Sequence, residues 1–562
     1  MGPQRPCDTR GALRIHGLLA ALASIAAAGV FAILLFGRLS HPLFWYDESE
    51  TAMFGRRVLE YGYPRVHGPR NTIYSLWHRS GVGLHEATDS YTGSPWLQYY
   101  VAALGEVFAA RVDDPYAKTL RVRLPFAVLG ALGLALLVAA VLPAVGGSPA
   151  RRLGFAAALF LLFGYSVSLV LHLREARHYP LTLLLTAAAL WVYLRRQVFG
   201  RLGPAAHAAG LGLALFLLFH TFFPAFAVLC AAMALHLGWR AARGRGSPRE
   251  LLPLALAAAA VAPGLAFFDF LAQTRGWVEQ WGAHSSYLGN LGFIAWFLAR
   301  YELLVPALLM RVAAEGLAAG GAPPGGPEPA QRRQIARILL LVAVTWALLL
   351  ARTPFLFERY FVVLGPLLAV MLALDAIGVA EGLLRARGRA RRIAGLAASL
   401  AALGFIGSIA VRAPDFAGRL QELRVPYRGP LDFVIPYLAE THPEPSALVI
   451  ATNYEETAFM YYLGSQVTVG FYGAELERDL RIQPDVIVPR PWPEQIEVLK
   501  ELSQRAAYRA REFPVTNLWW NNVPSLAPRG ARRAAHRFRT PLPAEGEPAL
   551  VILERVPAPE RG

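Results

Sequence analysis

Long apolar segments recur along the first 410 residues of this chain, and they constrain its fold more than any other feature. Each has about 18–20 residues, the length that an α-helix needs to cross the hydrocarbon core of a bilayer. Only 17% of the residues are charged, against about 25% in ordinary soluble proteins. We therefore predict a polytopic α-helical membrane protein with about eleven spans. These are 17–37, 123–143, 152–172, 179–195, 204–220, 222–239, 252–271, 291–311, 336–351, 357–379 and 393–411.

The stretch FHTFFPAF (219–226) leaves one alternative open, because it suits either a turn between two spans or a kink within one long helix. Arginines in the short loops favour the turn. With eleven spans, every arginine-rich loop falls on the same side, which the positive-inside rule makes the cytoplasm. The net charge of +16 then follows from topology, and a nucleic-acid-binding surface is not needed to explain it. The loop arginines are Arg151, Arg152, Arg195, Arg196, Arg201, Arg240, Arg243, Arg245, Arg249, Arg332, Arg333, Arg337, Arg385, Arg387, Arg389, Arg391 and Arg392.

Residues 412–562 differ in character, since acidic and basic residues are nearly balanced there. Four short runs rich in β-branched residues, SALVIAT, QVTVGFY, DVIVP and ALVILERV, predict strands, and the polar stretch 493–512 predicts a helix. We expect residues 1–411 to form the transmembrane domain and residues 412–562 a soluble extracytoplasmic α/β domain. An Arg/Ala/Gly-rich composition is typical of GC-rich bacterial genomes, so the bacterial inner (plasma) membrane is the expected location, with a cytoplasmic N-terminus.

The first outer loop, residues 38–122, begins with the stretch FWYDESE (44–50). Two surface helices are expected in this loop, at 48–60 and 95–111, and Gly62 is expected to end the first. Asp47 fits the N-cap of the first helix, with Glu50 completing a capping box. A capped carboxylate is also held rigidly, as a catalytic base must be. Neighbouring side chains on a helix diverge, so we expect Asp47 to act in the chemistry and Glu48 to brace the loop.

Two clusters at the outer ends of later spans add charged groups. Outer arginines oppose the charge bias of the loops, and they are the side chains that bind a lipid phosphate best. Snorkelling arginines or an interfacial aromatic belt would explain the same residues without a substrate. The clusters are LHLREARHYP (171–180), with Arg174, Glu175, Arg177, His178 and Tyr179, and FERYF (357–361), with Glu358, Arg359 and Tyr360. Further basic residues of the outer loop are His67, Arg70, His78, Arg79 and His85.

The order of these motifs resembles membrane glycosyltransferases of the GT-C type, most closely the protein O-mannosyltransferase and aminoarabinose transferase superfamily. The likeness covers roughly 15–410. It is carried by YDESETAMFGRRVLEYGYP, by SPWLQYYVAAL, by RVRLPFAVLGALGLALL, by EARHYPLTLLL through Arg177 and Tyr179, and by ERYFVVLGPLL through Arg359, Tyr360 and Pro366.

The resemblance implies that a sugar moves from a polyprenyl-phosphate donor to a hydroxyl acceptor on the outer face, usually with inversion. Asp47 and Glu48 would be the catalytic carboxylates. The donor phosphate would contact residues from Arg174, Glu175, Arg177, His178, Tyr179, Arg359 and Tyr360. The expected partners are the lipid-linked donor, the bilayer and a glycan, lipid or protein acceptor, and not nucleic acid. No metal site is assigned, although a divalent cation is possible because some relatives use a loop acid as a ligand.

Two other functions remain open from the sequence. A transporter or flippase of a lipid-linked envelope precursor would place charges within broken helices, often in repeated halves. Asp269 and Asp375 are the internal acids that could serve it, and both lie near span ends. A non-enzymatic assembly or sensor protein, whose outer domain binds a partner, is the third possibility.

Overall fold

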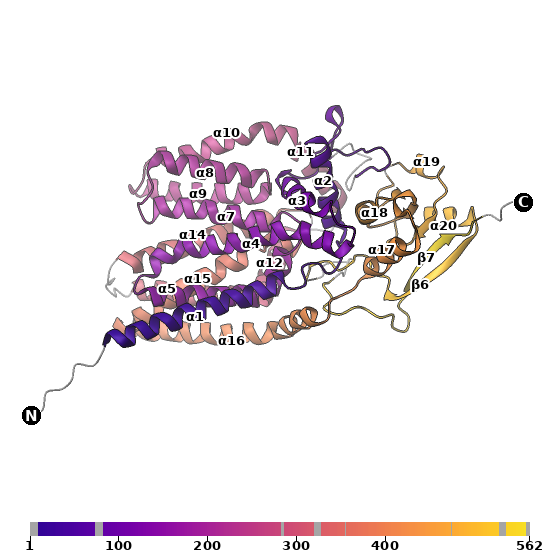
Figure 1. Cartoon of the computed structure of the whole chain (residues 1–562). Coiled ribbons are helices and arrows are strands. Elements are labelled where there is room, and N and C mark those ends of the chain that lie inside the picture. Colours follow the sequence, from indigo (N-terminus) through magenta and orange to yellow (C-terminus); the bar gives the residue numbers. More distant parts are fainter. Residues whose placement is uncertain are drawn as a thin grey trace, which may run out of the picture.

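The computed structural model describes residues 9–73, 83–282, 286–319, 327–354, 356–473, 475–527 and 535–557. A long helical bundle occupies one part of the molecule, and an α/β unit lies at one end of it (Figure 1). The bundle helices are α1 (Thr9–Phe36), α4 (Pro115–Val145), α5 (Pro149–Tyr165), α6 (Val167–Leu173), α7 (Tyr179–Gln197), α8 (Pro204–Phe219), α9 (Phe223–Ala242), α10 (Leu252–Phe267), α11 (Phe270–Trp281), α12 (Tyr287–Tyr301), α13 (Leu304–Ala319), α14 (Pro327–Leu350), α15 (Leu364–Arg385) and α16 (Gly388–Arg424).

All eleven predicted spans fall on these helices, which confirms the predicted class of polytopic helical membrane protein. Within the described ranges, seven helices are long and apolar enough to cross a membrane, and up to nine if each of two bent pairs counts as one span. The other two predicted segments are α7, with 19 residues, and α8, with 16. The stretch 219–226 is a turn, because α8 ends at Phe219 and α9 begins at Phe223.

Two spans predicted as single helices are sharply bent. The segment 152–172 divides at Ser166 into α5 and α6, which meet at 83°, and 291–311 divides at Glu302 into α12 and α13, which meet at 89°. Ser166 accepts a hydrogen bond from the Leu169 amide and so starts a new helix, as an N-cap does. Its hydroxyl also donates to the Glu302 carboxylate at 2.8 Å, so the two bends meet inside the protein.

The helix starts follow from local sequence. Proline stands in the first turn of many bundle helices, where its missing N–H costs no hydrogen bond. Asp114 and Ser148 cap α4 and α5 by accepting from the Ala117 and Arg151 amides. In the outer loop, α2 (Tyr46–Tyr61) and α3 (Leu97–Ala109) lie within two residues of the predicted helices. Gly62 ends α2 with φ +83°, as predicted.

The C-terminal α/β unit contains a five-stranded sheet with the order β4-β3-β5-β7-β6, in which β3, β4 and β5 are parallel and β7 runs antiparallel to both β5 and β6. Successive residues of β3 and β5 face opposite layers: Ile450 packs towards α17 and α18, and Ala451 packs towards α20. The sheet therefore lies between two helical layers. The elements are α17 (Pro430–Thr441), β3 (Val449–Thr452), α18 (Glu456–Leu463), β4 (Gln466–Val469), α19 (Leu476–Asp479), β5 (Val486–Val488), α20 (Ile496–Gln504), β6 (Tyr508–Thr516) and β7 (Ala549–Arg555).

One secondary-structure prediction was wrong. The stretch 493–512 was expected to be helical throughout, but helix α20 ends at Gln504 and strand β6 begins at Tyr508. β6 is an edge strand paired with β7, and its residues up to Glu512 are mostly exposed. Because an edge strand with a solvated face carries many charged residues, YRARE has too few apolar residues to reveal a strand in the sequence.

The bundle and the α/β unit share a hydrophobic core as well as a chain connection. One cluster of buried residues joins Phe44 and Phe54 of the outer loop with Val122 of α4, Leu431 of α17 and Phe459 of α18. α18 packs directly against α2. Helix α16 also runs past residue 411, where the sequence placed the boundary between two domains, and it continues to Arg424.

Candidate functional site

Asp47 lies between two arginines from distant parts of the chain. Its Oδ2 atom is 2.9 Å from Nη1 of Arg359 and 3.5 Å from Nη2 of Arg177. All three side chains are mostly buried, with between 13% and 19% of each exposed. Arg177 comes from the turn between α6 and α7, and Arg359 from the short 3₁₀ helix Glu358–Phe361 before α15. The fold thus assembles one acid and two cations at the α/β end of the bundle.

The start of α2 differs from the prediction. Trp45, and not Asp47, is the N-cap residue, and no side chain caps this helix. Asp47 stands in the first turn, where a carboxylate favours the helix dipole. Its side chain is directed at the two arginines, while its backbone carbonyl accepts from Arg177 at 3.1 Å. Asp47 does not cap α2 because the helix already begins at Tyr46.

Arg177 is held by several partners along α2. Its Nη1 atom donates to the Thr51 hydroxyl at 3.0 Å and lies 3.8 Å from the Glu50 carboxylate. Burial by itself lowers the pKa of the Arg177 guanidinium, but the Asp47 carboxylate raises it above its ordinary value. Arg177 therefore stays charged in this buried position.

Glu48 faces away from Asp47 and is almost fully buried. Its two oxygens accept from Nε and Nη2 of Arg123 at 2.8 and 2.6 Å, and the Ala176 amide donates to Oε1 at 2.8 Å. Arg123 also donates to the carbonyls of Leu39 and Pro42. This bidentate pair ties the outer loop to α4 and to the turn that carries Arg177. The geometry suits the bracing role expected for Glu48 better than contact with a substrate.

Glu175 belongs to a buried chain of polar contacts beside the Asp47 cluster. It accepts from Nε1 of Trp45 at 3.2 Å and pairs with Nδ1 of His172 at 2.6 Å. The other ring nitrogen of His172 is 3.6 Å from Glu358, which in turn accepts from the amides of Leu526 and Ala527. Burial raises the pKa of Glu175. Trp45 also lies against the Arg359 guanidinium, 5.2 Å from the ring centre.

The remaining predicted phosphate-binding residues have other surroundings than Arg177 and Arg359. Arg174 donates to the carbonyls of Gly37 and Arg38 at the end of α1, so it closes that helix and does not contact Asp47. His178 is buried and stacks on Phe222, and Tyr179 is buried beside it. Tyr360 is partly exposed, and the Arg359 guanidinium lies 5.9 Å from its ring centre.

Basic residues of the outer loop bind protein groups where the structure describes them. Arg70 donates to the carbonyls of Ser446 and Gly464, His67 pairs with Asp89, and His85 contacts Thr88. His78 and Arg79 lie outside the described residues. None of the three described residues contacts Asp47.

The site also includes residues of the C-terminal unit, which the sequence did not indicate. Tyr46 donates to Glu456 at 3.1 Å and stacks on Tyr454. Ser49 and Thr457 share a hydrogen bond of 2.6 Å. An aromatic cluster next to Asp47 combines rings of the outer loop and the C-terminal unit: Trp45, Tyr46, Tyr454, Phe471, Trp492, Tyr472, Trp519 and Trp520.

A divalent cation does not fit this arrangement as it stands. Over the described part of the chain, no group of three or more His, Cys, Asp or Glu side chains could hold a metal ion. The Asp47 oxygen that would bind a cation is occupied by two guanidinium groups.

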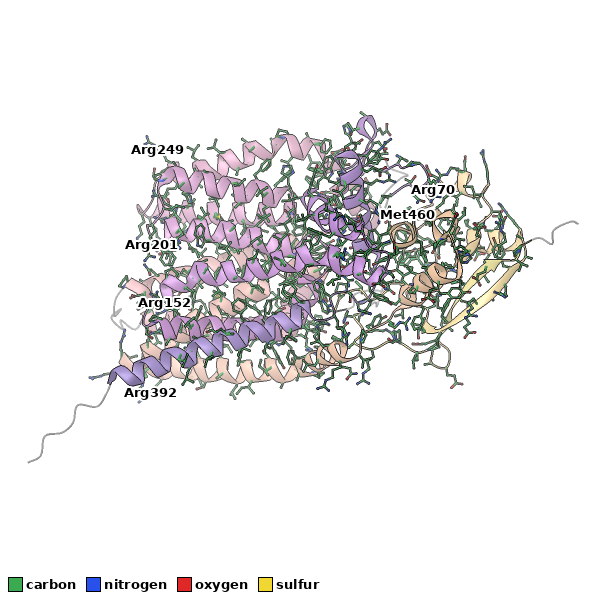
Figure 2. All side chains as sticks on the ribbon, viewed as in Figure 1. Arg70, Arg152, Arg201, Arg249, Arg392 and Met460 are labelled. Atoms are coloured by element: carbon green, nitrogen blue, oxygen red, sulfur yellow. The ribbon has the colours of Figure 1, made fainter. Side chains whose placement is uncertain are left out.

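The charge distribution separates the two ends of the bundle. Figure 2 labels Arg152, Arg201, Arg249 and Arg392, and all four lie at the end farthest from the α/β unit. Arg70 and Met460 lie on the other side, near the α/β unit. The predicted topology requires that the arginine-rich loops gather at one end of the bundle, as they do here. Asp47 lies at the opposite end, next to the α/β unit.

Solved structures of two other proteins are similar to this chain. ArnT from Cupriavidus metallidurans, in the apo state, is 14% identical with a TM-score of 0.47, and the match covers 95% of this chain and 97% of that one. The same protein bound to undecaprenyl phosphate gives 13% and 0.47. The archaeal oligosaccharyltransferase AglB from Archaeoglobus fulgidus, in complex with an inhibitory peptide and a dolichol-phosphate, is 12% identical with a TM-score of 0.46, over 84% of this chain and 69% of that one. No protein-family model and no curated protein sequence matches the chain.

Two residues of the site could have been found from the sequence. Arg123 stands at the start of a long apolar run, and an arginine buried at such a position needs an acidic partner. His172 also lies in an apolar segment, where a polar ring needs partners. The contributions of Tyr454 and Glu456 had no sequence signal, because only the packing of α18 on α2 brings them to the site.

Proposed function

We propose that this protein is a membrane glycosyltransferase that moves a sugar from a polyprenyl-phosphate donor to a hydroxyl group. The observation that carries the proposal is the convergence of Asp47, Arg177 and Arg359 at the α/β end of the bundle. An acid between two cations, beside apolar helices, suits a reaction that needs a base and a stabilised phosphate leaving group. The reaction would take place on the extracytoplasmic face, with residues 412–562 on that side.

The two arginines would bind the donor phosphate. Departure of the phosphate leaves negative charge on its oxygens, and guanidinium groups held in place beforehand stabilise that charge. Each guanidinium can also bind two phosphate oxygens at once. Because the phosphate is already a good leaving group, the site needs no strong general acid.

Asp47 would remove the proton from the acceptor hydroxyl. While both arginines contact it, the Asp47 carboxylate is engaged by their guanidinium groups and is not free to accept from an acceptor hydroxyl. A bound phosphate would compete for the same guanidinium groups and so release the carboxylate for proton transfer. This competition gives an order to the reaction, in which the donor binds before Asp47 becomes an effective base. Without bound donor, Asp47 would stay paired with the two arginines and would not remove a proton.

The test compares envelope glycans by mass spectrometry in cells with the gene, without it, and with the Asp47→Asn variant. We expect a glycan, lipid or protein species to lose the mass of one sugar on deletion. The wild-type gene should restore that species, and the variant, present at equal amounts in the membrane, should not. Full restoration by Asp47→Asn would overturn the assignment of the base.

A transporter of a lipid-linked precursor is the second candidate, and the two bent helix pairs favour it. Transporters bind substrates at broken helices, and here the breaks meet where Ser166 contacts Glu302. A buried pair between Arg311 and Asp375, at 3.0 Å, adds charge inside the bundle. Vesicles that contain purified protein would distinguish the two functions. Movement of a fluorescent undecaprenyl-phosphate lipid across the bilayer, unchanged by Asp47→Asn, would favour the transporter.

A further inference from the structure

An open groove lies between the end of α16 and residues 537–539. It has a volume of 590 Å³, within the range of small-ligand sites. Ala417 and Gly418 of α16 and the Phe538 ring give it an apolar floor, and Arg537 and Arg539 supply its charges. None of these residues contacts the Asp47 cluster, so the groove is separate from the proposed active site.

The segment that carries the two arginines is fixed to the protein through its backbone and its neighbour His536. Nε2 of His536 lies 3.3 Å from Glu422 of α16, and the His536 amide donates to the Ser525 carbonyl at 2.6 Å. The Arg537 amide and carbonyl both bind the Asn522 side chain. Phe538 packs so closely on Gly418 that a Cβ atom there would clash with its ring. The two guanidinium groups thus project from a rigid support.

Within the described residues, no acidic group lies within ion-pair distance of Arg537 or Arg539. The two nearest acids of α16 already have partners: Asp415 pairs with Arg300 and Glu422 with Arg419. Arg537 and Arg539 are both exposed. The groove therefore offers two uncompensated positive charges above an apolar floor.

The groove lies where α16 leaves the apolar part of the bundle. The last apolar run of this helix ends at Val411, and the groove begins at Pro414 and extends to Gln421. At 1.5 Å per residue, these positions are about 5 and 15 Å beyond that run. The headgroup layer is about 5–8 Å thick on each side of the hydrocarbon core, so the groove begins within this layer, at Pro414, and extends beyond it. Figure 1 shows α16 along one edge of the bundle, ending beside the α/β unit.

We infer that this groove binds the phosphate headgroup of an anionic phospholipid in the leaflet on the α/β side. The phosphate would contact Arg537 and Arg539, and the polar headgroup would lie on Phe538 and Gly418. The positive-inside rule disfavours arginines at this end of the bundle, and a bound anionic headgroup would explain why Arg537 and Arg539 are there. Bound lipid would join α16 to residues 535–539 and so fix the α/β unit against the membrane surface.

Native mass spectrometry of the full-length protein, released from nanodiscs of mixed phosphatidylglycerol and phosphatidylcholine, tests this inference. We expect Arg537→Gln/Arg539→Gln to retain one phosphatidylglycerol fewer than the wild type. Each juxtamembrane arginine changes the affinity about fivefold, so the double variant should bind this lipid about 25-fold more weakly. Phosphatidylcholine retention should not change.

The matched control is Arg509→Gln/Arg511→Gln, which removes two charges from β6 of the same unit and should keep the lipid. Arg537→Lys/Arg539→Lys should also keep most of it, because the charge remains. If the glutamine variant does not fold, the wild type and the lysine variant still provide the test, since the preference for phosphatidylglycerol must weaken as salt increases. Inorganic phosphate up to millimolar levels should not displace the lipid. Equal lipid retention by the glutamine variant and the wild type, or a preference unaffected by salt, would overturn the inference.

Discussion

The Arg359 guanidinium lies 2.9 Å from the Asp47 carboxylate, although the two residues are far apart in the sequence: Asp47 is in α2 and Arg359 directly precedes α15. Arg359 also lies over the rings of Trp45 and Phe357, which fix the plane of the guanidinium. The pair is thus held before any substrate arrives. Because of this contact, loss of the Asp47 charge should lower the rate of sugar transfer but raise the affinity for a phosphate.

Replacement of Asp47 by Asn should abolish transfer without loss of fold. Loss of a general base lowers rates by about 10²- to 10⁴-fold. Transfer in isolated membranes would measure this effect, with protein amount determined by immunoblot. Asp113→Asn, an exposed acid of the same loop, is the matched control and should retain full activity. An Asp47→Asn rate within threefold of the wild type would contradict the assignment.

The same Asp47→Asn change should strengthen the binding of undecaprenyl phosphate. The neutral amide no longer competes for Arg177 and Arg359, and a partly exposed ion pair contributes about 1 kcal/mol. The Kd, measured by thermophoresis or by native mass spectrometry, should therefore fall about fivefold. Weaker binding by the variant would exclude the competition between phosphate and Asp47 that orders the proposed reaction.

Replacement of Arg359 by Ala should weaken undecaprenyl phosphate binding by about 10- to 150-fold, since a hydrogen bond to a charged group contributes about 1.5–3 kcal/mol. Arg359→Lys should recover part of the loss, because it keeps the charge but not the fork of donors. Arg352→Ala removes an exposed arginine that precedes the same 3₁₀ helix, and its Kd should match the wild type. An unchanged Kd for Arg359→Ala would mean that Arg359 only stabilises the loop.

Glu48→Ala should destabilise the protein by about 3–5 kcal/mol, because it leaves Arg123 buried without its partner. Arg123→Ala should have a similar effect. The double variant should lose less than the sum of the two single changes, since the pair acts as a unit. Thermal unfolding of the four proteins in one detergent would measure the coupling. Additive losses would show that the two side chains stabilise the protein independently.

Glu456→Gln should stabilise the contact between α18 and α2 at neutral pH. Burial raises the pKa of Glu456 to about 6 from an ordinary value of 4.5. A raised pKa means that the folded state binds the proton more tightly than the unfolded state does. The resulting contribution to the free energy of unfolding is fully present below pH 4.5 and is lost as the pH rises through 6. The shift corresponds to about 2 kcal/mol. The variant keeps a hydrogen-bond acceptor for Tyr46 and should unfold at a higher temperature than the wild type at pH 8.

At pH 4 the Glu456→Gln variant and the wild type should unfold at nearly the same temperature, since both side chains are then neutral. Glu497→Gln, on the exposed face of α20, provides the control at both pH values. A constant difference between Glu456→Gln and the wild type from pH 4 to pH 8 would show that the proton on Glu456 is not responsible.

The sequence by itself determined the parts of the fold that depend on solvent and on local geometry. A segment of about 20 apolar residues has few alternatives to a membrane helix, and its backbone must bond internally. Gly62 ended α2 because few other residues adopt its positive φ. Parallel strands β3 to β5 were visible because a buried strand is a continuous apolar run. Asp47, Arg177 and Arg359 were among nine candidate site residues named from the sequence.

Only the tertiary structure decided how those residues meet and what surrounds them. Asp47 lies in the first turn of α2 and not at its cap, and its carboxylate pairs with arginines from two distant segments. The bends at Ser166 and Glu302 depend on a contact between two separate spans, which no single span encodes. The rings of the C-terminal unit reach Tyr46 through packing of α18 on α2, and such long-range contacts leave no periodic signal in a sequence.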